Sequence, residues 1–85
     1  MIIEGRVLEK EPNLTAVFGG VQQPYVRVTI ARLDHPDVHA EARIVGQSDI
    51  PVGVGGRVKL DVTRTITDRR AGVVRFDATL LEAEP

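Results

Sequence analysis

Apolar residues recur at every second position over much of this chain, which is the period of a β-strand with one buried face. In "YVRVTIARLD" (residues 25–34) two valines and an isoleucine alternate with Tyr25, Arg27 and Thr29. The apolar residues are expected to face a core, and the other three are expected to face solvent. Similar alternation recurs in later segments, so strands dominate the expected structure.

The pattern predicts five strands, at residues 2–10, 25–34, 38–45, 57–67 and 73–81. Helical periodicity does not persist beyond one or two turns in the connection at 46–56. Gly5 suggests a bend or bulge in the first strand, as the corners of small barrels require. The later strands are expected to turn the following residues inward: Val38, Ala40, Ala42, Ile44, Val58, Leu60, Val62, Ile66, Val74, Phe76, Ala78 and Leu80.

Turn-forming residues mark the connections between these strands. Residues 11–24 contain Pro near each end and Gly-Gly near the middle, and their central "LTAVF" is able to extend as the arm of a hairpin. "HPD" (35–37) is expected to be a turn, and "DRRAG" (68–72) a basic hairpin tip. This order describes an antiparallel meander followed by a longer crossing.

Five short twisted strands leave two sheet edges, and closure into a barrel is the most economical way to protect them. We therefore expect an all-β fold, a small five-stranded antiparallel OB-like barrel, in a single domain over residues 1–85. An SH3-like barrel is the alternative, because the number of strands barely separates the two folds.

The composition indicates an aliphatic core and no covalent staple. Hydrophobic residues make up 42% of the chain but aromatic residues only 4%, and cysteine is absent. Disulfides and thiolate metal sites are therefore excluded, and association is a natural source of extra stability for a domain of this size. A homodimer is expected, since Val45, Val73 and Leu81 lie opposite the core-facing residues of their strands.

The formal net charge of −1 argues against a surface that is positive all over. The charge is unevenly distributed, however, because six basic residues but only two acidic ones lie between positions 57 and 75. Nine of the eleven basic residues are arginine, which suits bidentate phosphate contacts and stacking on bases but is equally a mark of a GC-rich genome. No segment approaches the roughly 20 apolar residues of a membrane span, and "MIIEGRV" does not look like a signal peptide, so a cytoplasmic location is expected.

The sequence offers no catalytic constellation, and neither an enzyme activity nor a cofactor or metal is expected. Ser48 has no histidine near it in the sequence. His35 and His39 have the spacing of helical metal ligands but flank a turn and a strand. "GVGGRV" (53–58) lacks the Lys-Ser/Thr of a phosphate loop and leads into a strand. Carboxylates such as Asp61 and Asp77 are expected to be surface charges paired across the sheet.

The outward side of the second and third strands is the candidate site. The corresponding face of an OB barrel, bordered by its 1–2 and 4–5 loops, binds single strands through a cationic groove and aromatic platforms. Tyr25 and Phe18 are the candidate stacking residues; the alternatives are that Tyr25 caps the core and that Phe18 folds onto a barrel end. The candidate phosphate contacts are Arg27, Arg43, Lys59, Arg69, Arg70 and Arg75.

The layout resembles the filamentous-phage single-stranded-DNA-binding proteins of the gene V type. The resemblance rests on the initial "MII", a Gly-containing connection ending in "QPY", the connector "IPVGVGG" and the final basic hairpin. It implies an OB-type barrel, a two-fold homodimer, and a phage or plasmid protein that coats single-stranded DNA during replication. By position it makes residues 12–24 a DNA-binding wing and carries the hairpin at 64–72 across the dimer axis.

Residues 12–24 contain no Lys or Arg, which predicts a shallow salt dependence of binding. The leading expectation is a protein that coats single-stranded DNA (or RNA) without sequence preference. The alternatives are a non-catalytic OB- or SH3-like interaction module whose partner is a protein, and an accessory or small-ligand domain.

Overall fold

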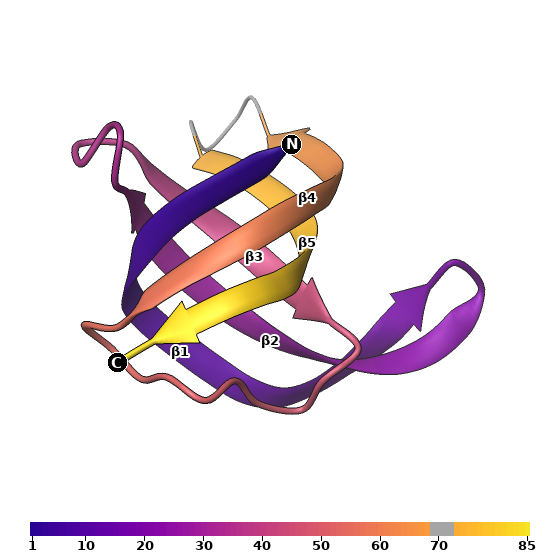
Figure 1. Cartoon of the computed structure of the whole chain (residues 1–85). Coiled ribbons are helices and arrows are strands. Elements are labelled where there is room, and N and C mark those ends of the chain that lie inside the picture. Colours follow the sequence, from indigo (N-terminus) through magenta and orange to yellow (C-terminus); the bar gives the residue numbers. More distant parts are fainter. Residues whose placement is uncertain (69–72) are drawn as a thin grey trace.

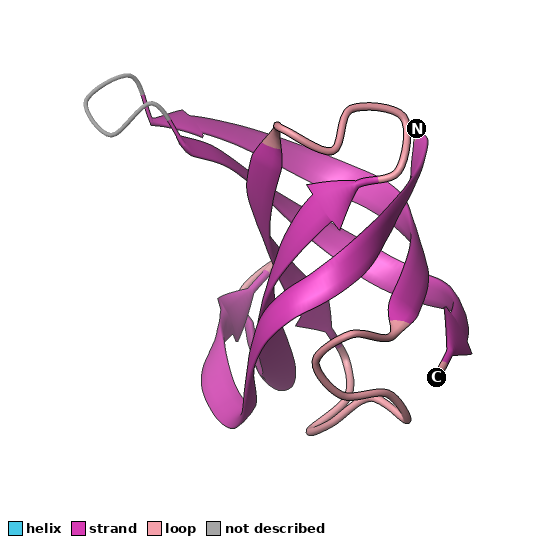
Figure 2. Cartoon of the chain, turned by 90° about the vertical axis from the view of Figure 1, so that its left-hand side faces the viewer, coloured by secondary structure: helices cyan, strands magenta, loops and turns pink. Residues whose placement is uncertain are grey.

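The computed structural model describes residues 1–68 and 73–85, and of residues 67, 68 and 73 it describes only the backbone. The described chain contains strands and loops (Figure 2). The five strands are β1 (Ile2–Phe18), β2 (Val21–Arg32), β3 (His39–Val45), β4 (Arg57–Asp68) and β5 (Val73–Glu84). The expected all-β class is confirmed.

The strands form a ring in the order β1-β2-β3-β5-β4, which closes because β1 pairs with both β2 and β4 (Figure 1). The expected meander and longer crossing are present. The expectation of a purely antiparallel sheet is wrong, because β3 and β5 are parallel. The connection 46–56 carries the chain past the end of the sheet to the far side of β1, and the β4–β5 hairpin then returns β5 alongside β3 in the same direction.

The core is aliphatic, as the composition predicts. Val26, Val28 and Ile30 of β2 are fully buried, and Phe76, the one aromatic residue expected inside, is also buried. The connection 46–56 contributes Ile50 and Val52 to the same cluster, so this loop helps to cover one end of the ring. Branched side chains thus fill much of the interior of the ring.

The first strand continues far beyond its expected end. The segment assigned to a connection pairs with β2 up to Phe18–Val21, and a two-residue Gly19–Gly20 turn with positive φ at both positions closes the hairpin. We call residues 12–24 the wing, which projects from the ring at the right of Figure 1. A bulge at Pro12 and Asn13, where Asn13 has φ of 62°, separates the wing from the rest of β1.

Bulges and strand ends account for the inward positions that were predicted wrongly. A bulge at Thr63 shifts the alternation of β4 by one residue, so that Ile66 lies opposite Arg75 on the outside. Val38 lies before β3 and is exposed, and Val74 lies near the end of the ring and is 46% exposed. The remaining nine predicted positions are buried or partly buried against the core.

Gly5 is not the site of the bulge in β1. It pairs regularly with Arg32 and Val58, and the register shift falls at Leu8. A Cβ at Gly5 would lie 2.8 Å from Cδ1 of Ile30, so the glycine allows the core side chain of β2 to approach the backbone of β1.

Candidate nucleic-acid interface

Two rows of outward-pointing side chains cross the sheet, and we call them together the outer face. The register places one row directly beside the other across all five strands. The first row, from β1 to β4, is Glu11, Arg27, Arg43, Asp77 and Arg64. The second row, in the same order, is Glu9, Thr29, Glu41, Arg75 and Ile66.

Arg27 and Arg43 therefore lie side by side, as the alternation predicted. β2 and β3 are antiparallel and are connected through the turn at 35–37, and their register places Arg27 directly opposite Arg43. The short turn thus positions two candidate phosphate contacts on one surface. Neither guanidinium is without a counter-charge, however.

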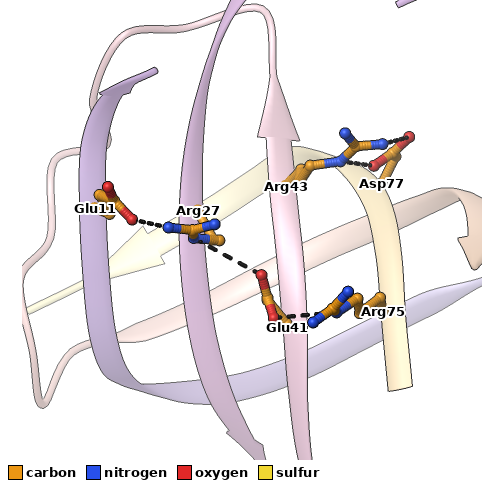
Figure 3. Close-up of polar contacts among 6 residues, drawn as sticks. All are labelled: Glu11, Arg27, Glu41, Arg43, Arg75 and Asp77. Carbon is orange, nitrogen blue, oxygen red and sulfur yellow. Dashed lines mark hydrogen bonds and ion pairs between the residues drawn. The ribbon is translucent and has the colours of Figure 1, made fainter. Parts of the chain in front are cut away.

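An ion-pair ladder runs across four strands of the outer face (Figure 3). Arg27 donates a hydrogen bond to Glu11, and its Nε lies 3.7 Å from Oε1 of Glu41. The other oxygen of Glu41 lies 3.3 Å from Nε of Arg75. The hydrogen bond with Glu11 is the main reason why the pKa of Arg27 is raised above its ordinary value. Any phosphate that binds here has to compete with these carboxylates.

Arg43 makes a separate, bidentate pair with Asp77 of β5 (Figure 3). Its Nε and Nη2 donate to the two carboxylate oxygens of Asp77 over 2.6 and 3.0 Å. The expectation that Asp77 pairs across the sheet is confirmed, but the expectation that it is a surface charge is wrong, because the residue is only 5% exposed. The hydroxyl of Thr63, in the β4 bulge, donates to the backbone oxygen of Asp77.

Two aromatic side chains, Phe18 of the wing and Tyr25 directly after it, lie against the same arginine. Phe18 and Tyr25 meet edge to face with ring centroids 5.5 Å apart. The guanidinium carbon of Arg43 lies 4.7 Å from the ring centroid of Phe18 and 5.9 Å from that of Tyr25, within the range of cation–π attraction. Both rings are half-buried on the outside of the sheet, so Tyr25 is not sealed in the core.

Shallow hollows flank this cluster on two sides. One lies between the wing and the β4 bulge, where Val17, Phe18, Thr63 and Arg64 surround the Arg43–Asp77 pair. The other lies along the ladder, where Ile66 and Phe76 line it together with Tyr25 and the face arginines. The wing and the β4–β5 hairpin thus border the outer face from opposite directions.

Lys59 does not join this cluster. Lys59 lies between Glu4 of β1 and Glu82 of β5, and its Nζ is 3.9 Å from a Glu4 oxygen. This places it on another part of the ring from Arg27 and Arg43. Arg69 and Arg70 lie outside the described residues.

The carboxylates of the outer face are the functional residues that the sequence reading missed. Glu11 was assigned to a connection, so its place opposite Arg27 was not foreseen. Asp77 was expected to be an outward-pointing charge, but only the register shows that it meets Arg43 and that Glu41 meets Arg27 and Arg75. The strand alternation combined with a parallel β3–β5 pairing would have found them.

The residues that were expected to form a dimer contact are only partly described. Leu81 is 47% exposed, and Val45 is half-buried opposite Tyr25. The side chain of Val73 lies outside the described part of the chain.

Comparison with known proteins gives no relative for this chain. No family model, curated protein or solved structure matches it. Among residues 1–68 and 73–85 there is no helix that is long and apolar enough to cross a membrane. The same residues contain no cluster of three or more His, Asp or Glu side chains that could hold a metal ion.

Proposed function

We propose that this chain is an OB-like barrel that binds single-stranded DNA or RNA on its outer face. The strand order, the parallel β3–β5 pair and the two bordering hairpins support an OB-like barrel over an SH3-like one. The observation that carries the function is the cluster of Phe18, Tyr25 and Arg43 on the outside of the sheet, next to the wing.

In this proposal the bases stack on the aromatic rings. Rings at the surface of a β-sheet present a face to any base, so stacking on Phe18 and Tyr25 requires no particular sequence. Arg43 adds a cationic group beneath the rings, and Asp77 fixes its plane through the bidentate pair. The single-stranded nucleic acid thus binds between the wing and the β4–β5 hairpin.

Phosphate contacts come from Arg27, Arg43 and Arg75, each of which exchanges part of its carboxylate pairing for a phosphate oxygen. Arg69 and Arg70, at the tip of the β4–β5 hairpin in sequence, extend this set. The chain acts as a homodimer without a cofactor or metal. Coating of single-stranded DNA during replication of a phage or plasmid is the role that fits this chemistry and the resemblance of the sequence.

The chain supplies its own spectroscopic reporter for the test. Tyr25 is the only tyrosine and tryptophan is absent, so intrinsic fluorescence reports on the proposed site alone. Titration with oligo-dT is expected to quench this fluorescence as bases stack on the ring. Phe18→Leu is expected to weaken binding of a labelled oligo-dT by about 1–3 kcal/mol, the usual contribution of one stacking platform.

Lys59→Ala is the matched control, because Lys59 lies on another part of the ring. Its affinity is expected to equal that of the wild type. Absence of binding at low salt would overturn the proposal, and so would binding that Lys59→Ala weakens but Phe18→Leu does not.

A protein-interaction module is the second candidate, and the balance of charge on the outer face favours it. The two rows contain as many carboxylates as guanidinium groups: Glu9, Glu11, Glu41 and Asp77 against Arg27, Arg43, Arg64 and Arg75. A mixed surface of this kind suits a protein partner with alternating charges. This candidate stands if oligonucleotides of DNA and RNA both fail to bind.

A further inference from the structure

The wing has two backbone edges that no further described strand covers: residues 14–18 of β1, and residues 21–24 of β2, where Pro24 accepts a hydrogen bond from the backbone N–H of Gly46. Throughout the wing, β1 pairs only with β2, from Leu14–Tyr25 to Phe18–Val21. Pairing of β1 with β4 is limited to residues 2–6 of β1. The last backbone hydrogen bond between β1 and the connection 46–56, the crossing loop, is donated by Asn13 to Ser48. Residues 14–18 therefore present a free strand edge, which we call the wing edge.

The turn determines which backbone groups point out of this edge. Residues that flank a two-residue hairpin turn exchange both backbone hydrogen bonds, and the next pair exchanges none. Since Phe18 and Val21 flank the Gly19–Gly20 turn, the N–H and C=O groups of Thr15 and Val17 point away from β2. Both residues are exposed, and Val17 is 68% exposed.

The wing edge lacks the charged residue that protects the free edge of β4. β4 pairs with β1 only up to Asp61, and its free continuation carries the charged residue Arg64. Charged residues on a free edge oppose pairing with other strands. The whole wing, from residue 12 to residue 24, contains no charged residue.

We propose that the wing edge pairs with the wing edge of a second copy of this chain. Antiparallel pairing about a two-fold axis at Ala16 places Thr15 opposite Val17 of the other copy, so the outward backbone groups on each side meet. Two-fold pairing sets a strand against itself, and a charged strand would then face its own charge. The absence of charge from the wing selects a second copy as the occupant, and the two wings form one four-stranded sheet.

This inference names the interface of the proposed homodimer and does not require nucleic acid. Five residues from each strand form a small interface, so the dimer is weak when nothing else holds the two copies together. Self-association is therefore measured on the protein alone by sedimentation equilibrium, up to roughly millimolar concentration. The wild type is expected to form dimers reversibly over this range.

Val17→Lys tests the edge, and Gln22→Lys is its matched control. The two residues are partners in the register, so both lysines lie on one side of the wing but on different strands. Val17→Lys is expected to weaken dimerisation about tenfold or more, whereas Gln22→Lys leaves it unchanged. Val17→Pro removes an N–H that β2 does not use and is expected to weaken dimerisation in the same way. Thermal unfolding of each variant verifies that the fold is retained.

Three results would overturn this inference. The wild type could remain monomeric throughout the range, or Gln22→Lys could weaken association as much as Val17→Lys. Thr65→Lys, on the free part of β4, could weaken it while Val17→Lys does not. A failed oligonucleotide titration bears on the proposed function and leaves this interface untouched.

Discussion

At the scale of single residues, the Arg43–Asp77 pair is the most buried ion pair of the described outer face. Asp77 is almost fully buried, while 32% of the Arg43 side chain remains exposed. Removal of Arg43 therefore leaves a buried carboxylate without a partner, whereas removal of Asp77 leaves a guanidinium that is partly exposed to solvent. A buried carboxylate without a counter-charge is costly, whereas a half-exposed guanidinium can turn to water.

This asymmetry predicts the order of stabilities in a double-mutant cycle. Arg43→Ala is expected to reduce the free energy of unfolding by about 3–5 kcal/mol, the usual cost of leaving a buried ion without its partner. Asp77→Ala is expected to cost less, about 1–3 kcal/mol. The double variant is expected to be less destabilised than the sum of the two, because the partners are coupled. Urea unfolding of the four proteins measures these values, and additive effects of equal size would contradict the prediction.

At the scale of elements, the crossing loop 46–56 is tied to β1 by backbone hydrogen bonds near both of its ends and by one side-chain ion pair, which we call the clasp. Nζ of Lys10 lies 2.9 Å from Oδ1 of Asp49, which also accepts the backbone N–H of Ile50. The hydrogen bond from Lys10 is the main reason why the pKa of Asp49 is lowered from its ordinary value of 3.8. The clasp places the loop so that Ile50 and Val52 reach the core.

The lowered pKa gives the clasp a defined pH dependence. A carboxyl group whose pKa is lower in the folded state contributes stability above its unfolded pKa, and this contribution is lost as the pH falls through the folded value. Asp49→Asn is therefore expected to lower the Tm slightly at neutral pH, and the difference from the wild type is expected to shrink below the ordinary pKa of 3.8. Thermal unfolding of Asp49→Asn and the wild type at neutral pH and below pH 3.8 measures the difference in Tm. A gap that widens on acidification would show that the charge of Asp49 does not stabilise the fold.

The elements also show what sequence patterns can and cannot establish. Alternation identified all five strands and most of the core, because the period of two is a local property of each strand. It failed at Ile66, because a one-residue bulge at Thr63 turns the following side chains of β4 to the opposite face of the sheet. It ended the first strand at residue 10, because Pro12 resembles a strand end until the bulge at Asn13 is known. The suggestion that residues 14–18 extend as the arm of a hairpin is confirmed by their pairing with β2.

The candidate site was only half predictable for a related reason. Tyr25, Arg27 and Arg43 could be placed on one surface from alternation and one short turn. Their acidic partners come from strands that are distant in sequence, and Asp77 reaches Arg43 only because β5 lies parallel to β3. Long-range register determines these contacts, and no local pattern contains it.

At the scale of the whole molecule, charge balance determines how binding should respond to salt. The chain carries a net charge of −1, and each of Arg27, Arg43 and Arg75 has a carboxylate partner. The surface therefore offers few guanidinium groups whose phosphate contacts release counterions. Stacking, which depends little on salt, has to supply most of the affinity.

The salt dependence of oligo-dT binding tests this division between stacking and charge. Each phosphate contact contributes about −0.7 to the slope of log K against log salt for single strands, so Arg27, Arg43 and Arg75 alone give a slope of about −2, and the addition of Arg69 and Arg70 brings it to about −3.5. Fluorescence titrations of Tyr25 at several salt concentrations give this slope directly. A slope steeper than about −4 would require cations beyond these five arginines. The interface would then extend to other basic residues such as Arg57 and Lys59, and the aromatic cluster would no longer be its centre.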